Sequence, residues 1–256
     1  MSTPPRPVHI GIGGWDYDPW RGTFYPPGLP KARQLSFASR AVTAIEINAT
    51  FYKLQRPELF ERWAAEVPEG FVFAVKASRF CTNRKLLGEG EEAIARFCGQ
   101  GFTRLGSRLG PILWQLAATK RFEPEDIAAF LALLPREQDG VPLRHVIEAT
   151  HESFRDERFV ALAREASVAI CMVDEGTQPP PDDHATAAFA YARLKHSREE
   201  EPCGYPSVEL DLWAERARGW SADPATPRDV FLFVIGGAKV RAPAAAQALI
   251  AALNLS

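Results

Sequence analysis

Lys76 is the residue of this sequence whose surroundings most favour covalent or acid/base chemistry. It directly follows the apolar run 71–75, and it is one of only seven lysines among the thirty basic residues. Burial at the end of such a run lowers the pKa of a lysine, which suits a Schiff-base nucleophile or a general base. The alternative, which we favour because such ion pairs are often structural, is a lysine that pairs with Glu46 or Glu148 or binds an anion.

Two carboxylates and one histidine are the candidates for proton transfer. Glu148 and Glu46 suit general acid/base catalysis, or else they neutralise a neighbouring cation such as Lys76. His151 could act as a proton shuttle, because imidazole side chains in general suit that role, although we favour a role in capping the helix that follows it. No pair of histidines accompanies the carboxylates, so the sequence predicts neither a catalytic metal nor a cofactor. The predicted catalytic set is therefore Glu148, Lys76 and His151.

Polar, aromatic and glycine residues that follow the other apolar runs form the predicted ligand-binding set. Gly236 and Gly237 begin a turn before the last helix-like segment, and Lys239 adds a cation there. Amides at a helix N-terminus bind phosphate, so this turn is a candidate phosphate site. It also fits a purely conformational role, because glycine adopts backbone angles that other residues avoid. The full predicted set is Trp15, Tyr17, Glu46, Asn48, Tyr52, Gln115, Asp174, Arg193, Lys195, Gly236, Gly237 and Lys239.

These residues lie within or just after eight short apolar runs that recur along the chain between longer helix-like segments. Each run has four to six residues and is almost continuously apolar, which is typical of a strand buried on both faces of a parallel sheet. The runs are 9–12, 44–47, 71–75, 112–116, 144–148, 168–173, 189–194 and 230–235.

Segments with helical spacing of apolar residues separate the runs, most clearly at 123–135, 154–164, 208–220 and 242–253. The segment 176–187, with three consecutive prolines, predicts a loop. Eight strands alternating with helices over about 250 residues predict the α/β class and a (β/α)8 TIM barrel. We expect a single domain over 1–256 with a flexible tail at 1–7. A doubly wound sheet is less favoured because no Gly-x-Gly-x-x-Gly pattern follows the first run.

Composition limits the partners and the compartment. The chain of 256 residues is 46% hydrophobic and 24% charged, and its net charge is −2. This balance argues against a broad basic surface, so nucleic acid is not favoured as a partner, although a local basic patch is compatible with it. The four cysteines lack zinc or disulfide spacing, and no apolar stretch reaches the ~18 residues of a membrane span. The N-terminus lacks the layout of a signal peptide, so we expect a reduced cytoplasmic protein without membrane partners.

The motif Glu-Ile-Asn-Ala-Thr-Phe-Tyr at 46–52 is the most specific pattern in the sequence. Further motifs lie at 13–17, 20–26, 70–77, 109–116, 148 with 151–154, and 191–194. Together they resemble the YecE-like family, also called domain of unknown function 72, over nearly the whole chain. The resemblance implies a TIM-barrel fold, in agreement with the strand count. It implies no particular reaction, because none is established for the family.

The chain departs from the family pattern at several polar positions near the predicted site. The pattern has an aromatic residue and an arginine after the glutamate of the fifth strand and a histidine after the third strand. It also has Arg-Leu-His at the seventh strand and Asn-Asn or Asp-Asn after the eighth. This chain has other residues at these positions, namely Ala149, Thr150, Asn83, Lys195, Gly236 and Gly237. We therefore expect a divergent member with an altered substrate or a lost activity.

These observations favour a metal-independent TIM-barrel enzyme that acts on a small anionic or phosphorylated ligand at the C-terminal ends of the strands. Glu148 would be the acid/base, and Lys76 an electrostatic stabiliser or nucleophile. The alternative is a non-catalytic binding module for a nucleotide, a nucleic-acid end or a protein partner. A carboxylate within hydrogen-bonding reach of Lys76 would favour catalysis over binding. A third hypothesis, a phosphoesterase acting on nucleic acid, requires metal ligands or a basic groove.

Overall fold

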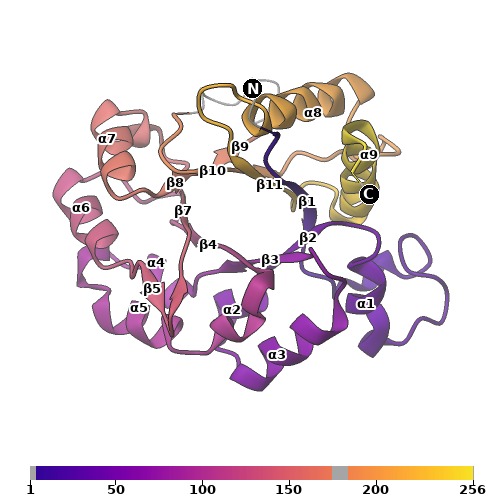
Figure 1. Ribbon diagram of the computed structural model, residues 1–256, viewed down its shortest axis with the longest axis horizontal. Helices are drawn as coiled ribbons and strands as arrows, with labels where there is room; N and C mark the ends of the chain where they lie inside the picture. The colour runs from indigo at the N-terminus through magenta and orange to yellow at the C-terminus, as the bar shows by residue number, and fades with distance from the viewer. Residues whose placement is uncertain (1–3, 175–183, 256) are drawn as a thin grey trace.

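A parallel sheet forms a ring at the centre of the molecule in the computed structural model, which describes residues 4–174 and 184–255 (Figure 1). Its strands are β1 (Val8–Gly13), β2 (Ala44–Ile47), β3 (Val72–Lys76), β4 (Leu109–Gln115), β7 (His145–Glu148), β8 (Ala169–Ile170), β9 (Met172–Val173), β10 (Phe189–Leu194) and β11 (Asp229–Val234). They neighbour one another in the order β8-β7-β4-β3-β2-β1-β11-β10-β9.

The ring is completed by two short strands that act as one. β8 pairs with β7 and β9 pairs with β10, and the two are separated only by Cys171, so together they fill the sixth strand position. Every pairing in this sheet is parallel. The TIM barrel predicted from the eight apolar runs is therefore confirmed.

Helices surround the ring, and in the described residues they lie between most of the successive strands (Figure 1). The observed helices coincide well with the segments predicted to be helical. The exception is α7, which begins later than expected because Asp156 accepts a hydrogen bond from Arg158 N at 2.8 Å and so caps the first turn. The loop predicted at 176–187 lies mostly outside the described residues. The helices are α1 (Gln34–Ala38), α2 (Ala49–Tyr52), α3 (Pro57–Glu66), α4 (Arg79–Thr82), α5 (Glu91–Cys98), α6 (Pro124–Ala132), α7 (Glu157–Glu165), α8 (Ser207–Ser221) and α9 (Ala242–Leu253).

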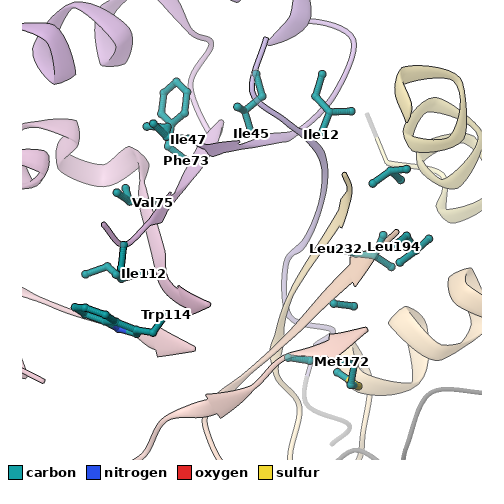
Figure 2. Packing of buried hydrophobic residues seen from close by; sticks show 14 of the residues in the cluster. Ile12, Ile45, Ile47, Phe73, Val75, Ile112, Trp114, Met172, Leu194 and Leu232 are labelled. Carbon is teal, nitrogen blue, oxygen red and sulfur yellow. The ribbon is translucent and has the colours of Figure 1, made fainter. Parts of the chain in front are cut away.

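Apolar side chains on the outer face of the strands pack against these helices. In Figure 2 the labelled residues, among them Ile12, Phe73 and Trp114, point away from the barrel axis. These three side chains are completely buried. Burial of a side chain of this kind contributes about 1.5–3 kcal/mol relative to its exposure. This outer layer holds the strands in register and fixes the positions of their ends.

Side chains on the inner face fill the barrel, and the period of two along a strand decides which residues reach its C-terminal end. On β10, Phe189 and Tyr191 belong to the inner apolar cluster, and Arg193 continues the same face. The inner face thus changes from apolar to polar toward the ends of several strands. The polar residues on it are Glu46, Lys76, Gln115, Glu148 and Arg193.

The chain is anchored before β1. Arg6 N donates to Ser221 O at 2.9 Å, and Arg6 Nε donates to Asp229 at 2.9 Å. Part of the segment predicted as a flexible tail therefore packs against α8 and the start of β11. Within residues 4–174 and 184–255, no helix combines the length and the apolarity needed to cross a membrane.

Candidate active site at the C-terminal end of the barrel

Arg193 is the centre of a buried charged network at the ends of β2, β7 and β10. Its Nε and Nη2 donate to the two carboxylate oxygens of Glu46 at 3.0 and 2.9 Å, which is a bidentate pair. Its Nη1 donates to Glu148 Oε2. The side chain of Arg193 is 4% exposed and that of Glu46 is 0% exposed. Burial opposes the charge of Arg193, but the two carboxylates hold its pKa above the ordinary value.

Glu148 accepts hydrogen bonds from three side chains. In addition to Arg193, Lys195 Nζ and Gln115 Nε2 donate to Oε1, the latter at 2.7 Å. Burial alone would raise the pKa of Glu148, but Arg193 and Lys195 lower it to about 2. A carboxylate that stays ionised and has both oxygens occupied is poorly suited to exchange protons near neutral pH. The geometry therefore opposes the acid/base role predicted for Glu148 and fits a role in positioning the two cations.

Lys76 lies beside this network but is not joined to it. Among the described residues, no hydrogen bond or ion pair involves its Nζ, and the favoured pairing with Glu46 or Glu148 is absent because other cations occupy both carboxylates. Burial lowers the pKa of Lys76 to about 8, against the opposing effect of Glu46. The ammonium lies 4.2 Å from the centroid of the Phe51 ring, within the range of a cation–π contact. Lys76 is thus a buried amine with an aromatic neighbour.

The segment that follows β2 fixes the surroundings of Lys76. Thr50 Oγ1 donates to Lys76 O at 2.7 Å and so attaches α2 to the end of β3. This attachment places Phe51 next to the ammonium. Asn48, predicted to bind ligand, is half-buried, and its Nδ2 donates to Glu46 O at 3.4 Å.

Tyr191 and Cys171 also belong to the network, and neither is among the residues predicted from the sequence. Tyr191 Oη donates to Glu46 Oε2 at 2.8 Å, and Cys171 Sγ lies 4.0 Å from Glu148 Oε2. Burial raises the pKa of both groups, which keeps both neutral. Tyr191 could have been found, because it precedes Arg193 by two positions and so shares its face of the strand. Cys171 gives no such indication within its apolar run.

His151 and Asp174 are both occupied by local structure. His151 Nδ1 accepts from Ser153 N at 3.1 Å and caps the short 3-10 helix Glu152–Phe154, so the proton-shuttle role is opposed and the capping alternative fits. Asp174 accepts from Tyr205 Oη at 2.7 Å and from Lys195 N. It is 5% exposed. Asp174 therefore holds the chain that follows β10 and orients Lys195, instead of facing a ligand as predicted.

The Gly236–Gly237 turn packs against the segment that follows β10. A Cβ on Gly237, whose φ is +70°, would lie 2.3 Å from Ser197 O, so the close approach of two backbones requires glycine. Gly236 N donates to Leu194 O at 3.4 Å, and Ala238 N donates to Ser197 O at 2.7 Å. Because these amides are used within the protein, the phosphate cradle predicted at this turn is not formed, and the conformational role fits.

Lys239, Tyr17 and Trp15 follow the neighbouring strands β11 and β1. Lys239 Nζ is 4.7 Å from the ring centroid of Tyr17. Burial lowers the pKa of Lys239, and Glu46 partly offsets this effect, so the cation shares the electrostatic environment of the network. Trp15 is half-buried and packs edge to face against another tryptophan at 5.1 Å. Tyr52 is 65% exposed and lies outside the network.

The ionisable side chains described in this site are mostly paired with one another. Within the described ranges 4–174 and 184–255, no group of three or more histidine, cysteine, aspartate or glutamate side chains could hold a metal ion. Two carboxylates are paired with Arg193 and Lys195, and Lys76 is left as an additional amine. The site can therefore attract an anion and present an amine to it.

Comparisons with known proteins agree with this description of the fold. The family described as "Protein of unknown function DUF72" matches residues 9–256. The UPF0759 protein YunF of Bacillus subtilis is 34% identical over 79 residues, which is 30% of this chain and 27% of that protein. The UPF0759 protein YecE of Escherichia coli is 28% identical over 142 residues, 54% of this chain and 48% of that protein. The chain thus spans half or less of the length of these curated relatives.

Solved structures of similar proteins share the whole fold. A DUF72 family protein from Thermotoga maritima has a TM-score of 0.77 and 22% identity, with 97% of this chain and 100% of that chain covered. A DUF72 family protein from Enterococcus faecalis has a TM-score of 0.74 and 18% identity, covering 97% and 96%. At these identities the likeness establishes the architecture and leaves the chemistry to the residues themselves.

Proposed function

The chain belongs to the DUF72 family, whose description assigns no reaction, and from that premise we propose a function on the basis of its site. The protein is a metal-independent enzyme that binds a small carboxylated or phosphorylated carbonyl compound at the C-terminal end of the barrel. Lys76 is the amine that attacks this ligand. The observation that carries the proposal is the burial of the Lys76 amine at the end of β3, which lowers its pKa to about 8.

The charge balance of the network supports an anionic ligand. Glu46 and Glu148 are matched by Arg193 and Lys195, so the positive charge of Lys76 is in excess. Burying an unpaired cation is unfavourable, and an anion that binds next to it removes the penalty. A carboxylate or phosphate group is the ligand chemistry that satisfies this condition.

The amine of Lys76 has the properties of a nucleophile. With a pKa of about 8, about a tenth of the amine is neutral at pH 7, whereas an ordinary lysine is almost wholly protonated. The neutral nitrogen adds to the carbonyl carbon of the ligand, its two protons pass through solvent water to the carbonyl oxygen, and the C–O bond breaks to release water and leave an imine. In this proposal Glu148 does not transfer the protons but holds Lys195 and Arg193 in place.

One observation favours the alternative, a non-catalytic module that binds a small anion. No carboxylate among the described residues lies within hydrogen-bonding distance of Lys76 Nζ, so the amine lacks an adjacent general base. In that function Lys76 would act only as a positive charge. The two functions differ in whether arginine can replace Lys76.

Reductive trapping tests the proposal. The protein is incubated with pyruvate, glyoxylate or pyridoxal 5′-phosphate and sodium cyanoborohydride, and the modified lysines are identified by peptide mass spectrometry. We expect one of these probes to label Lys76 faster than the six other lysines, which serve as internal controls. Labelling in proportion to exposure, greatest at residues such as Lys31, would contradict the proposal.

The variants Lys76→Arg and Lys76→Met separate the two functions. Thermal stabilisation by pyruvate or inorganic phosphate measures binding without chemistry. If Lys76 is a nucleophile, Lys76→Arg keeps this stabilisation but loses the trapped adduct, and Lys76→Met loses both. If stabilisation survives in Lys76→Arg and the wild type also forms no adduct, the protein is the binding module.

A further inference from the structure

Exposed apolar side chains gather in the loops next to the candidate active site. Tyr52 is 65% exposed and Phe80 is 66% exposed, and Leu86 is 44% exposed. Tyr52 ends α2, which follows β2, whereas Phe80 and Leu86 follow the adjacent strand β3. Both rings are therefore accessible to a partner at the end of the barrel that holds the candidate site.

The same loops carry a strong local excess of positive charge. We define the basic rim as residues 49–56, 77–90 and 116–123, which follow β2, β3 and β4. It contains seven lysines and arginines and two glutamates, whereas the net charge of the whole chain is −2. Among the described residues, five exposed cations of the rim have no carboxylate partner, namely Lys53, Arg56, Arg79, Lys85 and Arg121.

A groove separates the second and third segments of the basic rim. Its volume is about 580 Å³, and Arg84, Lys85 and Leu86 line one side of it. Lys120, Arg121 and one glutamate line the other side, and Lys120 is paired with Asp126 at 2.5 Å. Lys85 and Arg121, which have no carboxylate partner among the described residues, therefore place one unpaired cation on each wall, with an apolar side chain beside them. This is the shape and charge that a flexible polyanion requires.

The rim is continuous with the surroundings of Lys76. The rings of Phe51 and Tyr52 meet edge to face at 5.1 Å, and Phe51 contacts the Lys76 ammonium. On the other loop, Ser78 caps α4 by accepting from Phe80 N at 3.3 Å, and Arg79 lies 5.5 Å from the Phe80 ring. Each exposed ring thus belongs to a short anchored helix, and the Phe80 ring lies beside a cation.

We infer that the basic rim binds single-stranded nucleic acid. Phosphates pair with the exposed cations, and unstacked bases stack on Tyr52 and Phe80, which is how proteins bind single strands without base-specific hydrogen bonds. A duplex hides the faces of its bases from such rings. An anionic membrane surface is less well matched, because α2 and α4 have only four residues each and form no long amphipathic face.

The net charge of the chain led us to expect no nucleic-acid partner, and this inference revises that expectation. The excess positive charge of the basic rim is balanced by acidic residues elsewhere in the chain. It does not depend on the proposed function, because it requires only the surface of the loops and no reaction at Lys76. The two proposals therefore succeed or fail separately.

Fluorescence anisotropy with labelled oligothymidylate tests the inference. We expect the single strand to bind more tightly than a duplex of the same length, with an affinity that falls steeply between about 50 and 200 mM salt. Tyr52→Ala and Phe80→Ala should each weaken binding by about tenfold. Arg79→Gln and Arg121→Gln should each reduce the slope of log affinity against log salt by about 0.7.

Two variants outside the rim provide matched controls. Leu212→Ala removes a side chain on α8 that is 60% exposed, and Arg96→Gln removes an exposed cation on the outer face of α5. Both should leave binding unchanged. Equal losses in these controls, equal affinity for the duplex, or binding only to phosphatidylserine vesicles would each overturn the inference.

Discussion

Both ends of the barrel interior pair arginine with carboxylate side chains, but only the pairs of Arg193 at the C-terminal end are fully buried. At the N-terminal end, Asp229 accepts from Arg144 Nη1 at 3.1 Å and from Arg6 Nε at 2.9 Å. The Arg144 guanidinium lies 4.9 Å from the ring of Phe231, and His9 stacks on the same ring at 5.0 Å. Burial, with a smaller effect of Arg144, lowers the pKa of His9 to about 4, so this imidazole is neutral at pH 7.

The C-terminal end has a similar pairing of arginine with carboxylates and one additional cation. Arg193 joins Glu46 and Glu148, but Lys76 is buried without either of them. A cluster of charges that only closes the barrel needs each of its charged side chains to be paired, and the N-terminal end meets that description. Within the described part of the chain, Lys76 is a buried amine without a carboxylate partner, which lowers stability. This difference between the two ends agrees with the proposed place of the chemistry at the C-terminal end.

Removing Arg193 should have the largest effect on stability. In Arg193→Met, Glu46 and Glu148 lose their shared partner while they remain buried, so we expect a loss of about 3–5 kcal/mol in the free energy of unfolding. Arg144→Met at the other end should cost about 1 kcal/mol, because that side chain is 36% exposed and its pair is partly solvated. Urea denaturation of both variants measures the difference. Equal losses of unfolding free energy in the two variants would show that the two ends do not differ in how strongly they depend on their arginine.

The two ends should also lose stability in separate ranges of pH. The pKa of Glu148 is lowered from 4.5 to about 2, so its contribution of about 3 kcal/mol is present above pH 4.5 and is lost as the pH falls toward 2. The pKa of His9 is lowered from 6.5 to about 4. The unfolded chain therefore binds a proton that the folded chain does not, and stability falls between pH 6.5 and 4 by a similar amount.

Single variants assign each range of pH to its end of the barrel. Glu148→Gln should flatten the dependence of the unfolding free energy below pH 4.5, and His9→Gln should flatten it between pH 6.5 and 4. Urea denaturation over this pH series provides the measurement. If either variant removed both slopes, the two ends would not titrate independently.

Replacing Lys76 should stabilise the protein, in contrast to the loss of Arg193. The pKa of Lys76 is lowered from 10.5 to about 8, so the protonated amine costs stability at pH 7, and the cost decreases as the pH rises from 8 to 10.5. We expect Lys76→Met to raise the free energy of unfolding at pH 7 by about 2 kcal/mol. Destabilisation by Lys76→Met would show that the amine has a stabilising partner.

Much of the fold follows from local patterns in the sequence. Near-continuous apolar runs identify the eight strand positions because a parallel strand in a barrel is covered on both faces. The period of two within 189–194 then places Tyr191 and Arg193 on one face. Both patterns depend only on residues that are close together along the chain, so they can be recognised in the sequence.

The pairing within the site could not be predicted in the same way. Glu46 meets Arg193, which is 147 residues away, and this contact leaves Lys76 without a carboxylate among residues 4–174 and 184–255. Which cation takes which carboxylate depends on side-chain reach across the barrel, and the sequence does not show it. Likewise, the amides near Gly236 are used by Leu194 and Ser197 from another loop, so a turn that fits phosphate by its residues does not form that site.

Of these variants, Tyr191→Phe should have the smallest effect on the free energy of unfolding. It tests how much the phenol contributes to holding Glu46 at the C-terminal end. The phenol donates to Glu46 at 2.8 Å in a fully buried position, whereas Arg193 already supplies two hydrogen bonds to the same carboxylate. Loss of one hydrogen bond to a charged group costs about 1.5 kcal/mol, and the ring remains in place to fill the barrel. Urea denaturation should show this loss in Tyr191→Phe and a smaller one in Phe233→Leu, a control that changes the inner packing of β11 without touching a carboxylate. A loss in Tyr191→Phe as large as that of Arg193→Met would mean that Glu46 depends on the phenol as much as on the guanidinium.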